Sequence, residues 1–463
     1  MLVCLGALGA APAVAAPPPI RHVFVIVLEN KGFSETFGAG SQAPYLSKTL
    51  TAQGQLLANY YAVAHLSLPN YIAMVSGQAP NPVTQSDCQL YTDMVPGSIG
   101  ADGQAVGQGC VYPPPVKTVA DQLRAKGLTW RGYMQDMGNS PTEPKTCRHP
   151  ALNSQDKTQS AKVGDQYAAR HDPFVYFHSI IDDPANCNAN VVALDRLPAD
   201  LASTQSTPNY SFITPNLCED GHDAPCVDGR PGGLVSSDAF LRTWAPRILA
   251  SPAFQQDGLL VVLFDEAETG DATACCDEQS GPNTPNPGGS TAGPGGGLVG
   301  AVALSPWVRP GSINAHPYNH YGLLRSVEDI FGLSHLGYAG RAGLDAFGPD
   351  VYNGDGPAIV GPGCVEGALP KPRRGLYRRG SLIASAKVVR ARGHARLRLV
   401  FRHRASLDAR QTQRVRGRTR TVRLRLRTVR SCRTYLRILS RGHGSVKVVA
   451  HSGGGRETRT IRF

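Results

Sequence analysis

The stretch Val23-Phe24-Val25-Ile26-Val27-Leu28, followed by Glu29-Asn30, decides the fold. A short, continuous run rich in β-branched residues predicts a strand buried on both faces, as at the centre of a parallel sheet. A second run, Gly258–Phe264, ends in Asp265-Glu266 in the same way. Because ligands of open α/β sheets collect beyond the carboxyl ends of the strands, we expect both polar pairs at one edge of the sheet. Carboxylate and amide oxygens there suit a divalent metal ion.

Residues 17–360 alternate strand-like runs with helical stretches. Strands are also expected at residues 129–133 and 210–214, and helices at 71–76, 116–126, 238–249 and 321–331. Such alternation favours the α/β class, with a mainly parallel sheet flanked by helices. The Gly- and Pro-rich residues 280–297 are expected to form a flexible loop.

The charge of the chain divides into two opposite parts. The 463 residues carry a net charge of +12, but residues 371–463 contain 28 Lys and Arg and two acids, which leaves −14 for the remainder. A change this sharp predicts a domain boundary near residues 361–374, between a catalytic domain at 17–360 and a basic domain at 361–463.

The basic domain alternates apolar and polar residues with a period of two. Five segments show this pattern: residues 381–389, 395–401, 421–427, 435–439 and 445–449. It predicts antiparallel strands of a small β-sandwich. One face would carry rows of arginine and could adhere to an anionic membrane or envelope surface; the alternative is a solvated surface that aids solubility. Specific binding of nucleic acid is not predicted, because aromatic interleaving and a recognition-helix pattern are both missing.

The N-terminus and the cysteines both indicate export. Residues 2–16 are apolar and end in Ala13-Val14-Ala15-Ala16, so residues 1–16 are interpreted as a signal peptide, although a basic n-region is missing. An alanine-rich disordered leader is the alternative. The ten remaining cysteines suggest disulfides and a secreted or cell-envelope protein. Plausible pairs are Cys88–Cys110, Cys147–Cys187 and Cys218–Cys226; the sequence does not fix the connectivity, and no zinc-knuckle spacing occurs.

Ser67 is a candidate nucleophile. It lies in His65-Leu66-Ser67-Leu68-Pro69-Asn70, directly before the helix expected at residues 71–76. Backbone N–H groups at a helix N-terminus favour an anion, so a phosphate attached to Ser67 would be stabilised there. A simple helix cap is the alternative.

Two further segments carry groups that bind metal or phosphate. Residues 216–223 follow an expected strand and include Asn216, Asp220 and His222; the alternative is a polar turn closed by a disulfide. His320 precedes the last expected helix and needs the other groups to act as a ligand. Together the segments supply a hydroxyl nucleophile, ligands for one or two divalent cations and amide donors, which metal-assisted phosphoryl transfer requires.

In this order the motifs resemble the bacterial phosphoesterase family of the alkaline phosphatase superfamily, which holds secreted acid phosphatases and phospholipases C. Residues 170–177 and 197–201 resemble its phosphatidylinositol-3-phosphatase subgroup. The resemblance covers residues 21–348 and implies an alkaline-phosphatase-like fold. It implies that Ser67 is the nucleophile and a metal contact. The other implied roles are metal ligands at Glu29, Asp265 and Glu266, phosphate-side positions at Asn30 and Asn70, and further metal or substrate ligands at Asp220, His222 and His320.

The expected activity is that of an exported, metal-dependent phosphomonoesterase acting through a phosphoserine. Asn216 would join the substrate-binding amides, and His222 or His320 would serve as general acid. One alternative is a phospholipase C acting on diesters, and another is a non-catalytic protein that binds an anionic envelope. A sulfatase-like hydrolase is disfavoured, because Asn70-Tyr71 follow Pro69 where sulfatases carry an arginine nearby.

Overall fold

The computed structural model describes residues 16–354, residue 356, and strands between residues 383 and 462. The chain divides into two compact units, Met1–Gly356 and Pro357–Phe463, close to the change in charge. The predicted signal peptide, except Ala16, lies outside the described residues, as do Cys364 and Cys432. Among the described residues, no helix has both the length and the hydropathy needed to cross a membrane.

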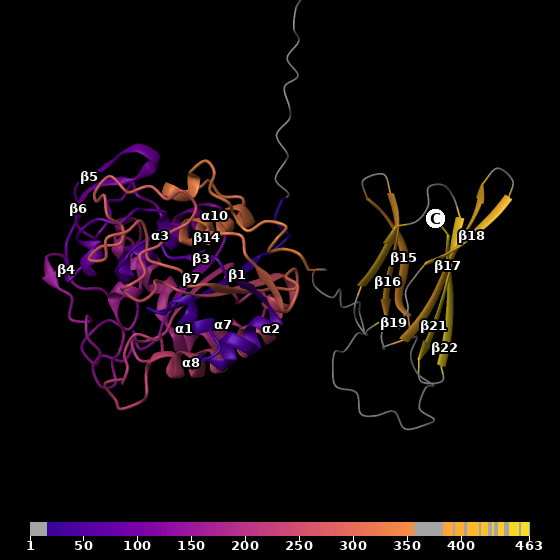
Figure 1. The fold of residues 1–463 in the computed structure, drawn as a ribbon, viewed down its shortest axis with the longest axis horizontal. Helices are drawn as coiled ribbons and strands as arrows, with labels where there is room; N and C mark the ends of the chain where they lie inside the picture. The colour runs from indigo at the N-terminus through magenta and orange to yellow at the C-terminus, as the bar shows by residue number, and fades with distance from the viewer. Residues whose placement is uncertain are drawn as a thin grey trace, which may run out of the picture. The chain divides into compact units, whose positions relative to one another are not determined.

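An eight-stranded sheet forms the centre of the described part of the first unit, in the order β13-β2-β12-β11-β1-β10-β7-β9 (Figure 1). Five adjacent strands are parallel: β11 (Gly258–Phe264), β1 (His22–Leu28), β10 (Tyr210–Thr214), β7 (Trp130–Met134) and β9 (Val191–Ala193). Beyond β11, β12 (Ala301–Leu304) is antiparallel to both neighbours, and β13 (Ser312–Asn314) is parallel to β2 (Gln55–Leu57). The predicted mainly parallel sheet is confirmed.

Strands β1 and β11 are buried along their whole length, which explains their uninterrupted apolar sequences. Figure 1 shows helices α3 (Ser67–Ser76) and α10 (His320–Phe331) on one side of the sheet. Helices α1 (Phe33–Phe37), α7 (Leu197–Asp200) and α8 (Gly233–Ala250) lie on the other. In the register of the central pair, Leu28 lies beside Phe264. The next residues, Glu29 and Asp265, therefore leave the sheet at the same level.

Several helices begin at residues whose side chains pair the free backbone N–H groups of the first turn, or at a proline that lacks such a group. α3 begins at Ser67, before the predicted start, because Pro69 lacks only an N–H that the first turn leaves unpaired. α4 (Val119–Ala125) has a capping box between Thr118 and Asp121, and Asn319 caps α10. α8 begins five residues before the predicted start. Residues 280–297 contain no helix or strand, as expected.

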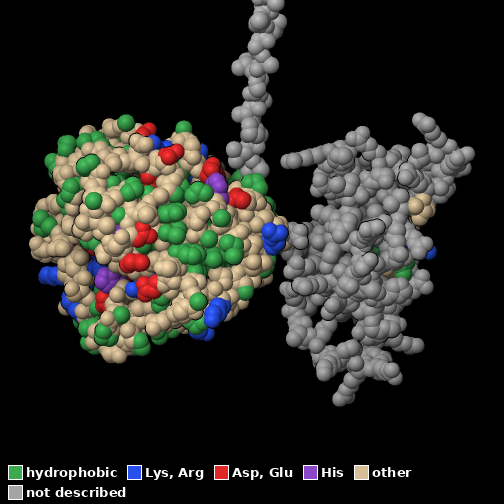
Figure 2. Space-filling view, in the orientation of Figure 1, with side chains coloured by type: hydrophobic (Ala, Val, Ile, Leu, Met, Phe, Trp, Pro, Cys, Tyr) green, Lys and Arg blue, Asp and Glu red, His purple; other side chains and the backbone are tan. Residues whose placement is uncertain are grey.

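Shorter elements complete the first unit. They are η1 (Tyr45–Leu50), α2 (Thr51–Gln53), β3 (Tyr60–Tyr61), η2 (Thr84–Ser86), β4 (Leu90–Tyr91), β5 (Val95–Ile99), η3 (Ala101–Gly103), β6 (Ala105–Gln108), β8 (Ser154–Gln155), η4 (Ala169–His171), η5 (Pro173–Tyr176), α5 (His178–Ile181), α6 (Pro184–Asn190), η6 (Leu194–Arg196), α9 (Pro252–Asp257), β14 (Tyr318–Asn319) and η7 (Gly337–Gly340). On the face of this unit in Figure 2, acidic and basic side chains are scattered among apolar and neutral ones.

Four disulfides occur among the described residues. The three plausible pairs from the sequence, Cys88–Cys110, Cys147–Cys187 and Cys218–Cys226, are all present. A fourth disulfide joins the adjacent Cys275 and Cys276 and was not predicted. The three predicted bonds close loops over separations of 22, 40 and 8 residues.

The second unit is all-β in its described residues. One antiparallel sheet contains β15 (Ile383–Ala391), β16 (His394–Phe401) and β20 (Thr434–Ile438). The other contains β18 (Arg418–Leu424), β17 (Ala405–Val415), β21 (Gly444–Ser452) and β22 (Gly455–Arg462), with β19 (Thr428–Val429) paired to β17. β17 and β22 were not predicted, because their sequences are largely polar. The arginine side chains of the predicted basic face lie outside the residues whose side chains are described.

Candidate active site

Ends of strands and helices bring most of the predicted site residues together. Glu29 follows β1 and Asp265-Glu266 follow β11, while Asp220 lies in the loop after β10. Ser67 is the first residue of α3. All five side chains are buried, with exposed fractions between 0 and 2%. The backbone N–H of Glu29 donates to the carbonyl of Asp220 at 2.9 Å, which joins the two loops.

Glu29 holds the hydroxyl of Ser67. The Oγ of Ser67 donates to Oε2 of Glu29 at 2.9 Å, and the hydroxyl of Tyr71, one turn further along α3, donates to Oε1. Burial is the largest cause that raises the pKa of Glu29 well above its usual value, and the charges of Asp265 and Asp220 add to it. The Oε2 of Glu29 is placed to accept the proton of Ser67, while its Oε1 lies 3.3 Å from Nε2 of His171.

Several buried polar atoms in this cluster have no hydrogen-bond partner among the described residues. They are both ring nitrogens of His171, Oδ2 of Asp220 and Oδ2 of Asp265. The Nε2 of His171 lies 3.3 Å from Oε1 of Glu29, and its Nδ1 lies 3.4 Å from Oδ2 of Asp220. Buried polar atoms are nearly always paired in folded proteins, so these clustered atoms have capacity for a bound group.

The chemistry of this set fits a divalent cation. Ligand atoms of Glu29, His171 and Asp220 all lie within 4.8 Å of one another, and carboxylate oxygens with an imidazole nitrogen are zinc-type ligands. Burial, followed by the charge of Arg170, lowers the pKa of His171 well below its usual value, so the ring is in the neutral form that binds metal. His171 was given no role from the sequence; only its place in the family-like segment 170–177 could have indicated one.

Asn30 and the acids after β11 lie beside this set. With its amide nitrogen turned toward the acids, Asn30 donates to Glu29, Asp265 and Glu266 at 3.2, 3.3 and 3.3 Å. Burial raises the pKa of Asp265 to about 6. The Nδ1 of His65 contacts Oε2 of Glu266, and its Nε2 lies 3.0 Å from the carbonyl of Asp271. His65 was not predicted as a site residue; it joins the loop before Ser67 to the end of β11.

Two amides that were predicted to bind substrate make hydrogen bonds within the protein. Asn70 accepts the N–H groups of Val63 and Ala64 and donates to the carbonyls of Ala64 and Leu66, so its amide holds the loop that delivers Ser67. Asn216 accepts two backbone N–H groups and donates to Asp136 at 2.8 Å. Because these hydrogen bonds occupy both amides, the geometry favours a role in shaping loops over contact with phosphate.

The two histidines predicted as general acids differ in their surroundings. His320 is fully buried between the hydroxyl of Tyr60 at 3.1 Å and the carbonyl of Asp265 at 2.6 Å. Burial lowers its pKa to about 4, so the ring is neutral and positions the loop. The His222 side chain is 36% exposed, and a hydrogen bond that its Nδ1 donates to Oδ1 of Asp223 raises its pKa. His222 is therefore the better proton donor of the two.

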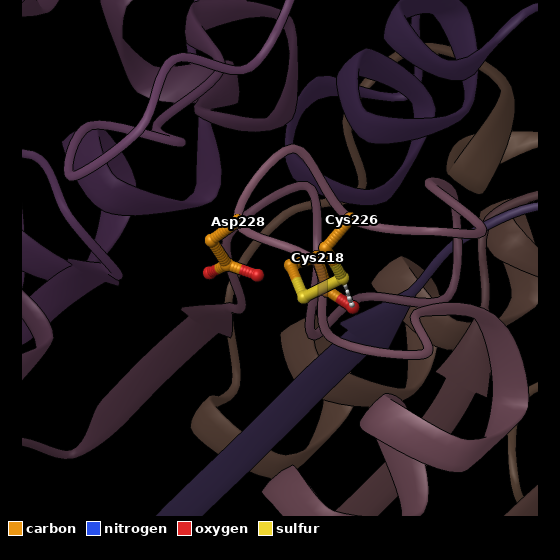
Figure 3. A group of neighbouring side chains, drawn as sticks. All are labelled: Cys218, Cys226 and Asp228. Carbon is orange, nitrogen blue, oxygen red and sulfur yellow. Dashed lines mark hydrogen bonds between the residues drawn. A yellow bond between two sulfur atoms is a disulfide. The ribbon is translucent and has the colours of Figure 1, made fainter.

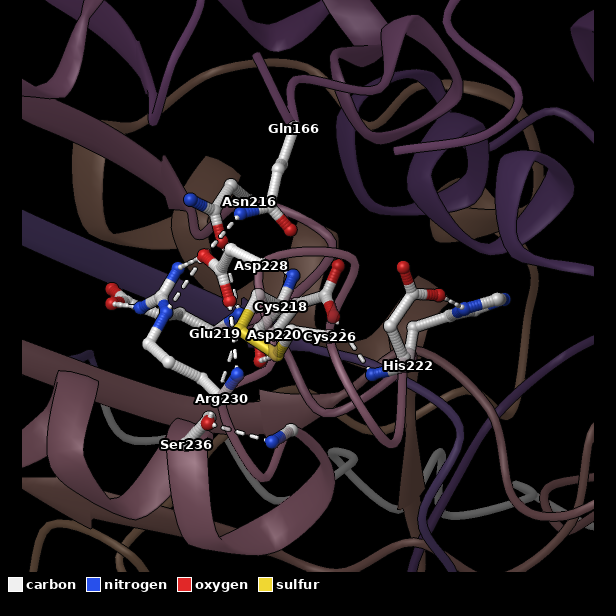
Figure 4. Close-up of a disulfide and its surroundings, with 12 residues drawn as sticks. Gln166, Asn216, Cys218, Glu219, Asp220, His222, Cys226, Asp228, Arg230 and Ser236 are labelled. Carbon is white, nitrogen blue, oxygen red and sulfur yellow. Dashed lines mark hydrogen bonds and ion pairs between the residues drawn. A yellow bond between two sulfur atoms is a disulfide. The ribbon is translucent and has the colours of Figure 1, made fainter. Parts of the chain in front are cut away.

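Figure 4 shows His222 directed away from the Cys218–Cys226 disulfide, while the backbone N–H of His222 donates to Oδ1 of Asp220 at 2.7 Å. Cys218, Cys226 and Asp228 lie close enough to hold a metal ion (Figure 3). The two sulfurs form a disulfide, however, so neither is available as a thiolate ligand. This group staples the loop and is not a metal centre.

The chain is similar in sequence to proteins named as phosphatases. The chain is 26% identical over 330 residues to a phosphatidylinositol-3-phosphatase of Mycobacterium tuberculosis, covering 71% of this chain and 83% of that protein. It is 27% identical over 317 residues to a probable acid phosphatase of Kluyveromyces lactis, covering 68% and 59%. The chain spans about half the length of the fungal relatives that it matches.

A solved structure of an alkaline phosphatase superfamily protein from Vibrio parahaemolyticus matches with a TM-score of 0.42 and 10% identity, over 94% of this chain and 88% of that one. The model of the Phosphoesterase family matches residues 39–334. That match covers more than half of the chain and confirms the resemblance seen in the motifs. The chain belongs to the Phosphoesterase family.

Proposed function

We propose that this protein is an exported, divalent-metal-dependent phosphatase that hydrolyses phosphate monoesters through Ser67. The observation that carries the proposal is the buried hydrogen bond from Ser67 Oγ to Glu29, set among carboxylates and a histidine that lack partners. Relatives named acid phosphatase and phosphatidylinositol-3-phosphatase support a phosphate ester as substrate. The disulfides of the first unit support export.

The proposed cation ligands are Glu29, His171 and Asp220, with Asp265 and Glu266 beside them for a second position. A bound cation would supply Lewis-acid stabilisation of the charge on the phosphoryl group. Without it, an anionic substrate would meet several buried carboxylates. The N-terminus of α3 adds a favourable helix dipole beside the nucleophile, although the N–H of Leu68 donates to Asp87 and Pro69 has none.

Residues of the chain carry the proton transfers. Ser67 Oγ gives its proton to Glu29 and forms a bond to phosphorus, while the bond from phosphorus to the leaving oxygen breaks. That oxygen takes a proton from His222, whose raised pKa favours the protonated ring. Water then attacks the phosphoserine and gives one proton to His222; its oxygen bonds to phosphorus, and Ser67 leaves with the proton that Glu29 had held.

Hydrolysis of p-nitrophenyl phosphate and p-nitrophenylphosphorylcholine tests the proposal. We expect wild type to prefer the monoester, and Ser67→Ala to lose at least about 1,000-fold in kcat. Ser34→Ala is the matched control, because Ser34 is an exposed serine. A chelator should abolish activity, and a divalent cation should restore it. Activity that survives Ser67→Ala would refute the mechanism, and preference for the choline diester would move the assignment to a phospholipase C.

We also propose that the basic segment holds the enzyme on an anionic membrane or envelope. Its support is the charge of +26 carried by residues 371–463. The full chain should sediment with vesicles that contain phosphatidylglycerol and not with pure phosphatidylcholine vesicles. Binding should fall steeply as salt rises from low to physiological concentration. Equal binding to both vesicle types would contradict the proposal.

A further inference from the structure

The disulfide between Cys275 and Cys276 is not explained by the stability of the fold. A disulfide stabilises a protein mainly by closing a loop in the unfolded chain, and its effect grows with the length of that loop. Cys275 and Cys276 are adjacent in sequence, so their bond closes no loop between them. The other three disulfides of the described residues span 22, 40 and 8 residues. The bond between the adjacent cysteines therefore contributes little to stability.

This disulfide is also the only one of the four between described residues that is not buried. Cys275 and Cys276 are half-buried, whereas the six cysteines of the other three disulfides have exposed fractions between 0 and 9%. Cys276 also lines a cavity of about 50 Å³, together with Glu278 and Arg341. Thiol–disulfide exchange requires direct attack on a sulfur atom, so an external thiol reaches this bond before it reaches the buried ones.

The backbone at this disulfide is held in an unfavourable conformation. Cys276 and Asp277 have φ angles of 69° and 51°. Residues with a Cβ rarely adopt this left-handed region, because the Cβ then lies too close to a backbone carbonyl oxygen. The covalent ring of Cys275 and Cys276 restrains this backbone. Once the bond between the sulfurs is broken, that restraint is lost, and residues 276–277 can return to negative φ.

The disulfide is connected to the candidate active site through the start of α10. Two residues after Cys276, the Oε1 of Glu278 accepts the side-chain amide of Asn319. Asn319 caps α10, and the Nε2 of the next residue, His320, lies 2.6 Å from the carbonyl oxygen of Asp265. This series of contacts joins the disulfide to one of the acids of the candidate site.

The loop that carries the disulfide also contacts the segment before the nucleophile. The carbonyl oxygen of Asp271, four residues before Cys275, lies 3.0 Å from the Nε2 of His65. His65 is two residues before Ser67, and its Nδ1 contacts Glu266. The loop therefore supports the position of Ser67 as well as that of the acids after β11.

We propose that Cys275–Cys276 is a redox-active disulfide that exchanges with an external dithiol, and that its reduction lowers phosphatase turnover while the first unit stays folded. The effect on turnover rests on the proposed function. The conformational change that follows bond breakage at residues 276–277 loosens the contacts of this loop with α10 and with His65.

The exchange proceeds in two steps. A thiolate of the dithiol bonds to the Sγ of Cys276 while the bond between the two protein sulfurs breaks, and the Sγ of Cys275 takes the electron pair and a proton. The second thiolate of the reductant then attacks its own first sulfur and releases Cys276, which also takes up a proton. The protein gains two electrons and two protons, and the dithiol becomes a cyclic disulfide. The new thiol of Cys275 has an acceptor in the carbonyl oxygen of Tyr318, which lies 3.4 Å from its sulfur.

Alkylation of the native full-length chain tests the redox activity. The protein is treated with increasing concentrations of dithiothreitol, free thiols are blocked with iodoacetamide, and the cysteine peptides are quantified by mass spectrometry. We expect Cys275 and Cys276 to be blocked at a lower concentration than the six cysteines of the buried disulfides, with tryptophan fluorescence unchanged. Simultaneous or later blocking would overturn the inference, as would peptides of the untreated protein that join Cys275 or Cys276 to a different cysteine.

Hydrolysis of p-nitrophenyl phosphate over the same titration tests the effect on turnover. We expect kcat/KM to fall about fivefold, the factor that corresponds to the loss of one ordinary hydrogen bond, and to recover on reoxidation. The control is the double variant Cys275→Ser/Cys276→Ser, which should start at the lowered value and not respond to dithiothreitol. An unchanged kcat/KM in the reduced wild type would overturn the effect on turnover. An equal response of the double variant would also overturn it, because the reductant would then act through a metal ion or another disulfide.

Failure of this inference is distinguishable from failure of the proposed function. Phosphatase activity that survives Ser67→Ala, or no activity in the oxidised wild type, would refute the function and with it the effect on turnover. The order in which the cysteines are alkylated would still decide whether the Cys275–Cys276 bond is redox-active.

Discussion

Replacement of Glu328 by Gln should remove a specific pH dependence from the stability of the first unit. Glu328 is fully buried in α10; its Oε1 accepts the N–H of Leu336 at 2.8 Å, and its Oε2 has no partner among the described residues. Burial is the main cause that raises its pKa to about 9. The native state therefore holds a proton on Glu328 that the unfolded chain releases above about pH 4.5.

The direction in which pH changes the free energy of unfolding follows from this difference in bound protons. Below about pH 4.5 both states are protonated and Glu328 costs nothing through ionisation. As pH rises toward about 9, the unfolded state is favoured by about 1.4 kcal/mol per pH unit. Gln is neutral at every pH and keeps the acceptor for Leu336. The stability of Glu328→Gln relative to wild type should therefore increase by about 4 kcal/mol between pH 5 and pH 8.

Urea unfolding at pH 5, 6, 7 and 8 measures this change. The three tryptophans, Trp130, Trp244 and Trp307, all lie in the first unit, so their fluorescence reports its unfolding. Glu143→Gln serves as the control, because Glu143 is exposed. A difference in unfolding free energy that stays constant from pH 5 to pH 8 would refute the reasoning, since it would mean that native Glu328 is ionised.

Three further predictions concern the site and the disulfides. Glu29→Gln should lower kcat on p-nitrophenyl phosphate by at least about 100-fold, because an amide cannot take the proton of Ser67; steady-state kinetics measure this, and an unchanged kcat would contradict it. His171→Ala should weaken Zn²⁺ or Mn²⁺ binding at least about tenfold in calorimetry, and equal affinity would remove His171 from the ligand set. Replacing Cys147 and Cys187 by Ser should lower the free energy of unfolding in urea by about 4 kcal/mol, against about 2.5 kcal/mol for Cys218 and Cys226. The reason is that the first bond closes a loop of 40 residues and the second a loop of eight. The reverse order would contradict the loop-entropy argument.

The central sheet was predictable because strands that are buried on both faces have continuous apolar sequences. Strands β1 and β11 are continuous apolar runs, and the acids that follow them meet because the strands are parallel neighbours in register. β17 in the second unit, by contrast, is mostly polar, so its sequence lacks the regular alternation of apolar and polar residues that predicts a strand. The pairing of Cys275 with Cys276 was also missed; spacing alone does not indicate which cysteines pair.

The candidate site was predictable in its location and less so in the role of each residue. Asn70, Asn216 and His320 have the residue types that bind phosphate or transfer protons, and they lie beside the loop of Ser67, beside Asp220 and beside Asp265, respectively. Their polar atoms are taken by nearby backbone or by buried side chains, which sequence spacing does not reveal. His171 was missed for the opposite reason, because it is 142 positions from Glu29 in sequence and becomes its neighbour only in the folded chain.

Completed hydrogen bonds distinguish the residues that build the site from those that face a ligand. A buried polar atom without a partner destabilises the folded chain by roughly 1–3 kcal/mol. Such atoms also occur away from the site, as at Oε2 of Glu328, so it is their clustering beside Ser67 that is informative. The polar atoms of Asn70 and His320 are paired, whereas His171, Asp220 and Asp265 each have a polar atom without a partner among the described residues. These three incompletely paired groups belong to one buried cluster that includes Glu29, the acceptor of the Ser67 hydroxyl. A divalent cation would complete the two acids and the histidine, and this is the argument for the proposed metal dependence.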